Sequence, residues 1–209
     1  MQITIFGANG RVGRLVVAEA LKRNFVVVAF VHGNSPFENQ DNLQVITGDI
    51  YNKNDVMTAV QGSSAIISTL GSWGTSKKNI LSEGMKNIIP AMQTSGISRI
   101  ISLTGSGCKS NLDHRSFKQF FNRMPLMIIA PKVLWDAEKH IELLEISDLD
   151  WTILRSPVMN NKGNPDKFNF VANVPMPLAK INRKSVATAM INLLENENYS
   201  KKSIFITKT

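Results

Sequence analysis

The chain has 209 residues, 43% of them hydrophobic, and a formal net charge of +8. This length suffices for a full hydrophobic core, and no run of eighteen apolar residues occurs, which excludes a predicted membrane-spanning helix. The basic residues are scattered along the sequence without a zinc-finger, RNA-recognition or basic-zipper pattern, so specific nucleic-acid binding has no support. The charge can equally attract phosphorylated or acidic small molecules.

The amino terminus enters a predicted strand at once, without the basic region and apolar stretch of a signal peptide. The only cysteine, Cys108, cannot form an internal disulfide, which fits a reducing compartment. No linker or repeat divides the sequence. We therefore expect one domain over residues 1–209 that is soluble and cytoplasmic, without membrane association, as a monomer or a homodimer.

The first predicted elements are a strand, a turn and a helix. Gln2 to Phe6 is a short apolar run that stops at a glycine, and from Arg11 the apolar residues follow helical spacing. Asn24 marks the helix stop. Phe25 to Val31 is the continuous β-branched and aromatic run that a strand buried on both faces requires. This order is a βαβ unit.

Further strands are predicted beyond this unit, with helical stretches between most of them. They cover Leu43 to Thr47, Ala65 to Leu70, Arg99 to Leu103, Trp151 to Leu154 and Ser203 to Thr207. A helix is expected from about Leu81 to Thr94, with a kink or an early end at Pro90, because proline lacks a backbone donor. Asn160 to Pro177 is rich in Pro and Asn and is expected to be a long loop. The alternation predicts an α/β fold with a Rossmann-type, doubly wound parallel sheet.

The turn Gly7-Ala8-Asn9-Gly10-Arg11-Val12-Gly13 has the context of a dinucleotide-binding turn. A pyrophosphate must approach the helix amino terminus closely, and a Cβ at the nearest points would obstruct it. The glycine pattern alone is weak and an ordinary turn is the alternative, but here it follows a strand and opens an amphipathic helix. The candidate cofactor residues of this turn are Gly7, Asn9, Gly10, Arg11, Val12 and Gly13.

The end of the second strand bears on the choice of cofactor. Domains that prefer NAD normally carry Asp or Glu there, whereas NADP requires a cation for its 2′-phosphate. Residues 30–35 contain no carboxylate. Arg11, His32 and Ser35 can together hold a phosphate, which favours NADP(H) over NAD(H). His32 alone is equivocal, since a histidine is largely neutral at pH 7, and Arg11 can equally be a solvated residue at the helix start.

With these residues placed, the sequence resembles the atypical short-chain dehydrogenase/reductase group that contains the NmrA-like proteins and the biliverdin-IXβ reductase/flavin reductases. The resemblance runs through most of the chain. Beyond the glycine turn, it is carried by Gly48-Asp49, Ser68-Thr69-Leu70-Gly71, Ser82-Glu83-Gly84-Met85-Lys86-Asn87-Ile88 and Leu149-Asp150-Trp151-Thr152-Ile153-Leu154-Arg155-Ser156-Pro157.

The resemblance implies where the cofactor lies. Asp49 and Ile50 would contact the adenine, and Leu70 and Gly71 would run along the cofactor. Thr104 and the residues after it would lie near the nicotinamide, and Pro157 joins the same set of cofactor residues. The substrate is then expected over the carboxyl ends of the strands, where open α/β sheets place their ligands.

The residues for proton transfer differ from those of many dehydrogenases, which use a Tyr-Lys pair. Neither Tyr51 nor Tyr199 precedes a lysine in a Tyr-x-x-x-Lys pattern, and the nearest frame is Trp135-Asp136-Ala137-Glu138-Lys139. An indole is only a weakly acidic donor. Thr104 and Ser106 are the catalytic candidates, as hydroxyls that orient the substrate or the nicotinamide. That these hydroxyls merely cap backbone groups is an equal alternative.

Aromatic residues supply the candidate substrate contacts. Phe117, Phe120, Phe121 and Met124 recur at helical spacing and either line an apolar pocket or, more commonly, form core. Trp73 either flanks the cleft or lies in a surface loop. We take Trp73, Phe117 and Phe121 as substrate candidates.

Two substrate-side loops are expected, at about 106–135 and 157–180. His114 and His140 have no partner at the spacing of metal ligands, so no metal site is assigned.

The sequence thus favours an NADP(H)-dependent oxidoreductase that transfers hydride to a flavin, a quinone or a similar conjugated acceptor. In the flavin-reductase relatives such transfer can depend mainly on positioning, with solvent supplying the proton. The alternative is a non-catalytic NADP(H)-binding redox sensor of the NmrA type. A sugar-nucleotide or isoflavone-type reductase is a third class, kept open by Lys139.

Overall fold

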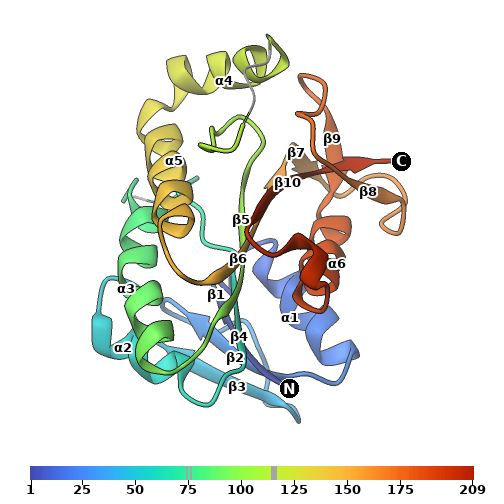
Figure 1. Cartoon of the computed structure of the whole chain (residues 1–209). Coiled ribbons are helices and arrows are strands. Elements are labelled where there is room, and N and C mark those ends of the chain that lie inside the picture. Colours follow the sequence, from blue (N-terminus) through green and yellow to red (C-terminus); the bar gives the residue numbers. More distant parts are fainter. Residues whose placement is uncertain (74, 76, 114–116) are drawn as a thin grey trace.

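The apolar strands assemble into one eight-stranded sheet in the order β3-β2-β1-β4-β5-β6-β10-β8 (Figure 1). The computed structural model describes residues 1–73, 75, 77–113 and 117–209. In sheet order, the strands are β3 (Leu43–Thr47), β2 (Val26–Val31), β1 (Gln2–Phe6), β4 (Ala65–Ser68), β5 (Arg99–Gly105), β6 (Asp150–Ser156), β10 (Lys202–Lys208) and β8 (Phe168–Val171). All neighbours pair in parallel except β8, which runs antiparallel to β10. The predicted Rossmann-type sheet is confirmed.

Helices cover both faces of the sheet (Figure 1). They are α1 (Gly13–Lys22), α2 (Lys53–Val60), α3 (Ile80–Thr94), α4 (Phe117–Ile129), α5 (Pro131–Glu145), α6 (Arg183–Leu194) and the short 3-10 helix η1 (Glu197–Tyr199). Ile3 and Ile5 of β1 pack in one buried cluster with α1 and α6, whereas Phe6 packs in another with α2, α3 and α5. Because both faces of the sheet are buried, the sequences of its central strands are continuous apolar runs. None of the described helices is both long and apolar enough to cross a bilayer.

The prediction that this helix ends early at Pro90 is wrong, because α3 continues from Ile80 to Thr94. One lost backbone donor is outweighed by tertiary packing. Met85, Ile88 and Met92 of this helix are fully buried in the core shared with α5. Burial of such an apolar face supplies most of a helix's stability in a folded protein.

The expected loop between Asn160 and Pro177 contains a strand, β8, and is therefore wrong in part. Phe168 and Phe170 alternate with polar residues, which is the period of a half-buried strand. Their rings pack edge to face, and Phe170 also packs against Tyr199. Two shorter strands, β7 (Val158–Asn160) and β9 (Lys180–Asn182), form a separate parallel pair beside it.

His140 of α5 is a fully buried titratable group in this core. Its Nε2 lies 2.7 Å from the hydroxyl of Ser102, and its Nδ1 lies 3.3 Å from the carbonyl oxygen of Ala137. Burial lowers the pKa of His140 from 6.5 to about 4, because the charged imidazolium would lose its hydration. The folded protein therefore holds this ring neutral.

We predict that this histidine makes the fold less stable below neutral pH. In the unfolded chain the ring gains a proton below about pH 6.5, whereas in the folded chain it does so only near pH 4. The neutral ring therefore costs no stability above pH 6.5. Between pH 6.5 and 4 its effect lowers the free energy of unfolding by about 3 kcal/mol. Urea unfolding of the wild type and of His140→Gln at several pH values tests this. An unchanged pH slope in the variant would contradict the assignment.

Candidate functional site

A cleft of about 1310 Å³ opens at the carboxyl ends of the central strands. Its walls include the residues that follow β1, β2, β3, β4, β5 and β6. The chain leaves β1 for β2 on one side and later returns to β4 on the other side, so the strand order reverses at β1. Open α/β sheets bind ligands at such a reversal.

The glycine turn forms the floor of this cleft. Gly7 has a positive φ of 76°, and a Cβ there would lie 3.0 Å from the backbone of Thr69 and Leu70. The amide of Gly10 donates to the carbonyl of Gly7 at 2.9 Å and closes the turn. Gly7 therefore permits both the backbone conformation and the contact between the turn and the end of β4.

Gly13 serves the packing of the turn, since it does not line the cleft. A Cβ at Gly13 would lie 2.2 Å from the carbonyl oxygen of Gly7, so a side chain at this position would push α1 away from β1. The N-cap of α1, Val12, makes no capping hydrogen bond through its side chain, and the first turn carries no acidic residue. The start of α1 thus carries no capping side chain and no carboxylate that would compete with an anion, although the Arg14 and Leu15 amides already donate to the carbonyls of Gly10 and Val12.

The end of β2 lies beside this turn. Asn9 donates through its side-chain amide to the carbonyl of His32 at 2.9 Å, and Arg11 and His32 both line the cleft. Ser35 does not line it. Its hydroxyl instead accepts from the amide of Phe37 at 3.0 Å in a local turn. The structure thus brings Arg11 and His32 to one wall and places Ser35 outside.

Asp49 and Ile50, expected beside the adenine, and Leu70 and Gly71, expected along the cofactor, all line the cleft. Tyr51 joins them. The ammonium of Lys77 lies 3.9 Å from the centre of the Tyr51 ring, and the Tyr51 hydroxyl donates to Asn79 at 3.1 Å. Partial burial and then nearby carboxylates raise the pKa of Tyr51, so its hydroxyl stays protonated at neutral pH.

The opposite end of the cleft is formed by the residues that follow β5 and β6. Thr104, Ser106 and Pro157 line it, as does the buried Cys108. The hydroxyl of Thr104 is directed at the Cys108 sulfur at 3.7 Å, and the Ser106 amide is bound to a β6 carbonyl at 2.8 Å. Burial raises the pKa of the Cys108 thiol, so it is not an anionic nucleophile.

One turn of α5 faces the cleft with apolar side chains. Val133 and Ala137, four residues apart, line the cleft, whereas Trp135 and Lys139 do not. Trp135 is exposed, and Lys139 pairs with Glu142 at 3.0 Å. The helix position that could present a Tyr-Lys pair to the cofactor therefore carries valine and alanine.

The substrate candidates separate in the structure. Trp73 and Phe121 line the cleft, whereas Phe117 is 86% exposed and does not. The stripe that contains Phe117 and Phe121 lies on a helix, α4, within the expected loop 106–135, and its aromatic side chains are exposed rather than core.

Several cleft residues had no recognisable sequence signal. On the far side of the cleft these are chiefly Leu126, Met159, Leu178 and Arg183, from α4, β7, the segment before β9 and the start of α6. In the sequence these residues are ordinary apolar or basic side chains that belong to no motif, so they could not be recognised as cleft residues. In the described ranges no group of His, Cys, Asp and Glu could hold a metal ion, and His114 lies outside those ranges.

A buried carboxylate holds the loop after β4 in place. Asp136 is fully buried and accepts hydrogen bonds from the hydroxyl of Ser72, which lines the cleft. It also accepts from the backbone amides of Leu81 at 3.1 Å and Ser82 at 2.9 Å, which begin α3. One side chain of α5 thus caps α3 and fixes one cleft wall.

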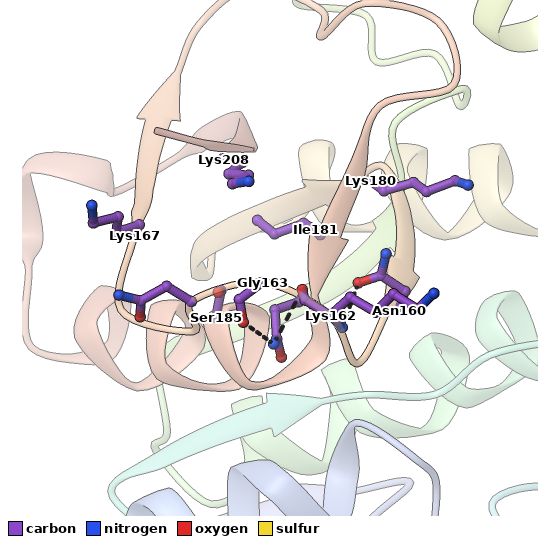
Figure 2. A pocket seen from close by; sticks show the side chains of 10 residues that line it. Asn160, Lys162, Gly163, Lys167, Lys180, Ile181, Ser185 and Lys208 are labelled. Carbon is purple, nitrogen blue, oxygen red and sulfur yellow. Dashed lines mark hydrogen bonds between the residues drawn. The ribbon is translucent and has the colours of Figure 1, made fainter.

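A second hollow, of about 170 Å³, lies apart from the cleft between the β7–β9 pair and the end of β10. Figure 2 shows Lys167 and Lys208 on one side of it and Lys162 and Lys180 on the other. Basic residues that are scattered in the sequence are therefore gathered in space. The nearby start of α6 differs from that of α1, because the Asn182 side chain accepts from the Lys184 amide and caps it.

A reversal of strand order, an uncapped helix start behind a tight glycine turn and a long cleft define a dinucleotide-binding domain. Residues 7–197 match the sequence profile described as NAD(P)H-binding, and the chain belongs to that family. This agrees with the resemblance to the atypical short-chain dehydrogenases/reductases.

The solved structures most useful for comparison share the fold at low identity. A putative NAD-dependent epimerase/dehydratase from Bacillus halodurans has a TM-score of 0.81 at 19% identity, covering 100% of this chain and 94% of the other. A short-chain dehydrogenase/reductase from Veillonella parvula in complex with NADP has a TM-score of 0.79 at 18% identity, covering 99% and 94%. ChuY, an anaerobilin reductase from Escherichia coli O157:H7, has a TM-score of 0.76 at 23% identity, covering 100% and 97%.

A curated relative matches only in part. A 3-beta-hydroxysteroid dehydrogenase from Mycolicibacterium neoaurum is 30% identical over an alignment of 112 residues that covers 48% of this chain and 31% of that protein. The chain thus spans about a third of the length of this relative.

We predict that Asp136→Ala lowers the free energy of unfolding by about 3 kcal/mol, because buried donors lose their acceptor. This corresponds to a fall in melting temperature of roughly 6–12 °C for a chain of this size. Glu142→Ala, which removes a half-exposed carboxylate from the same helix, is the control and should change stability by less than about 1 kcal/mol. Equal effects of the two substitutions in thermal unfolding would refute the role of Asp136.

Proposed function

We propose that this protein is an NADP(H)-dependent oxidoreductase that reduces a flavin, a quinone or a similar conjugated acceptor. One observation carries the proposal: beyond the residues that follow β5 and β6, apolar side chains from α4, α5, β7 and the segment before β9 line the cleft. Leu126, Val133, Met159 and Leu178 contribute to its walls. A planar conjugated ring suits such walls, and a cleft of about 1310 Å³ offers more space than the roughly 300–1,000 Å³ of a typical single-ligand pocket.

The preference for NADP(H) is supported by the charges near the end of β2. Arg11 and His32 share a cleft wall beside the uncapped start of α1. The nearest acidic cleft residue in the sequence is Asp49, which follows β3 rather than β2. A cation without a carboxylate at the strand end favours a 2′-phosphate over a free ribose hydroxyl.

The proposed reaction rests on positioning. The dihydronicotinamide of the cofactor supplies a hydride, and a proton from water completes the two-electron reduction of the acceptor. Thr104 and Ser106 would orient the nicotinamide or the acceptor, while Val133 and Ala137 keep that wall apolar. Such a wall excludes water from one side of the reacting atoms and provides no dedicated acid.

The absence of a proton donor on the wall formed by Val133 and Ala137 also fits the second class, a non-catalytic NADP(H) sensor. Turnover separates the two classes, because a sensor binds the cofactor without consuming it. The third class, which would need Lys139 as a catalytic group, is disfavoured by the position of that lysine outside the cleft.

We predict that Arg11→Ala weakens NADPH binding about 10- to 100-fold and NADH binding much less. Only NADPH carries the phosphate that a charge-assisted hydrogen bond from Arg11 would hold. Titrations that follow nicotinamide fluorescence measure both constants. Lys22→Ala, at the other end of α1, is the control. Equal losses for the two cofactors in Arg11→Ala would refute the role of Arg11.

We predict NADPH consumption with at least one member of a panel of free flavins, quinones and aldehydes. Lys139→Ala should keep kcat within about twofold, because Lys139 does not reach the cleft. Loss of a true general acid typically costs about 10²–10⁴-fold. Tight NADPH binding without turnover of any acceptor would contradict the proposed oxidoreductase function and favour the sensor function.

A further inference from the structure

Helix α4 presents most of its apolar side chains to solvent, whereas its polar residues Gln119, Asn122 and Arg123 face the protein. Phe117, Phe120, Met124 and Ile128 lie at spacings of three and four residues and therefore share one face. All four are exposed, and Phe117 and Ile128 are 86% and 73% exposed. This is the reverse of the usual arrangement for a helix on the surface of a globular protein.

The opposite face of α4 is fixed to the protein by polar contacts. Gln119 is buried and donates to Asp113, and Asn122 donates to the carbonyl of Pro175 at 3.0 Å. Arg123 forms an ion pair with Glu138 of α5. The exposure of the apolar face is therefore set by specific contacts on the other side of the helix.

We propose that the exposed face of α4 docks against the same face of a second copy of this chain. Six side chains make up the face: Phe117, Phe120, Phe121, Met124, Met127 and Ile128. An aromatic side chain has an area of about 150–250 Å², and Met and Ile have somewhat less. Multiplied by the exposed fraction of each residue, these areas sum to an exposed surface on the order of 700 Å². A standard interface buries about 800 Å² per partner, whereas the largest patch of a typical monomer is about 300–600 Å².

A second copy fits this face for reasons of symmetry and composition. In a two-fold dimer the same patch serves both partners, so one apolar stripe is sufficient. Side chains spaced by three and four residues are the ones that interdigitate when two helices pack. Phenylalanine and methionine are enriched in protein interfaces. Figure 1 shows α4 at one end of the molecule, away from the sheet, where a second copy can approach it.

A membrane surface fits this helix less well. A helix that lies in a bilayer interface carries Lys and Arg along the polar face that points to water. The polar face of α4 instead points to the protein, where Gln119, Asn122 and Arg123 are already bonded. The proposal therefore commits to a second copy and makes lipid an outcome of the test.

Sedimentation equilibrium of the full chain over a wide range of micromolar concentrations tests the proposal. We expect a species of twice the 23.2 kDa of one chain that dissociates on dilution. In Phe120→Glu/Ile128→Glu the dissociation constant should rise at least tenfold, because charges would be buried between the copies. Ile146→Glu is the matched control, since Ile146 is 72% exposed at the end of α5 and lies outside the stripe.

Several outcomes would overturn the proposal. They are a wild type that remains monomeric at every concentration, a dimer that the double variant leaves unchanged, and a control that weakens the dimer equally. Co-sedimentation of monomeric protein with anionic phospholipid vesicles, lost in the double variant, would assign the face to lipid instead. Far-ultraviolet circular dichroism verifies that the variants are folded.

Discussion

The close approach of α1 to the end of β1 is the constraint on which the cleft depends. Because Gly13 has no side chain, α1 can begin against the carbonyl oxygen of Gly7, and Gly7 in turn can lie against the end of β4. The amides at the start of α1 are thereby directed to the point where the strand order reverses. A side chain at either glycine would displace the helix, the turn or β4, and the floor of the cleft would open.

The remaining walls depend on buried polar side chains that come from distant parts of the chain. Asp136 of α5 fixes Ser72 and the start of α3. Arg155 of β6 is fully buried against the Phe205 ring and bonds both Asp113 and the carbonyl of Cys108, which holds the loop after β5. These contacts replace regular secondary structure in the segments that carry the candidate site, so the loops have defined positions.

Local patterns were sufficient to predict the sheet, because each parallel strand buried on both faces leaves a continuous apolar run and the glycine turn has a fixed spacing. That turn and the resemblance also predicted residues that line one part of the cleft, among them Gly10, Asp49 and Leu70. The far half was not predictable in the same way. Leu126, Met159 and Leu178 converge only through tertiary packing. Ser35 had the right chemistry, but its hydroxyl is used in a local turn.

The sequence period of α4 also could not predict whether its apolar face points to the core or to solvent. Helical spacing of Phe117, Phe120 and Met124 predicts an apolar face, but it does not tell which partner covers that face. The orientation is decided by polar partners outside the helix, Asp113, Pro175 and Glu138, which contact its opposite side. Leu126 lines the cleft from the side of α4 opposite the exposed stripe, whereas Phe121 lines the cleft and also belongs to the stripe, so a second copy bound to the stripe would lie at the edge of the cleft.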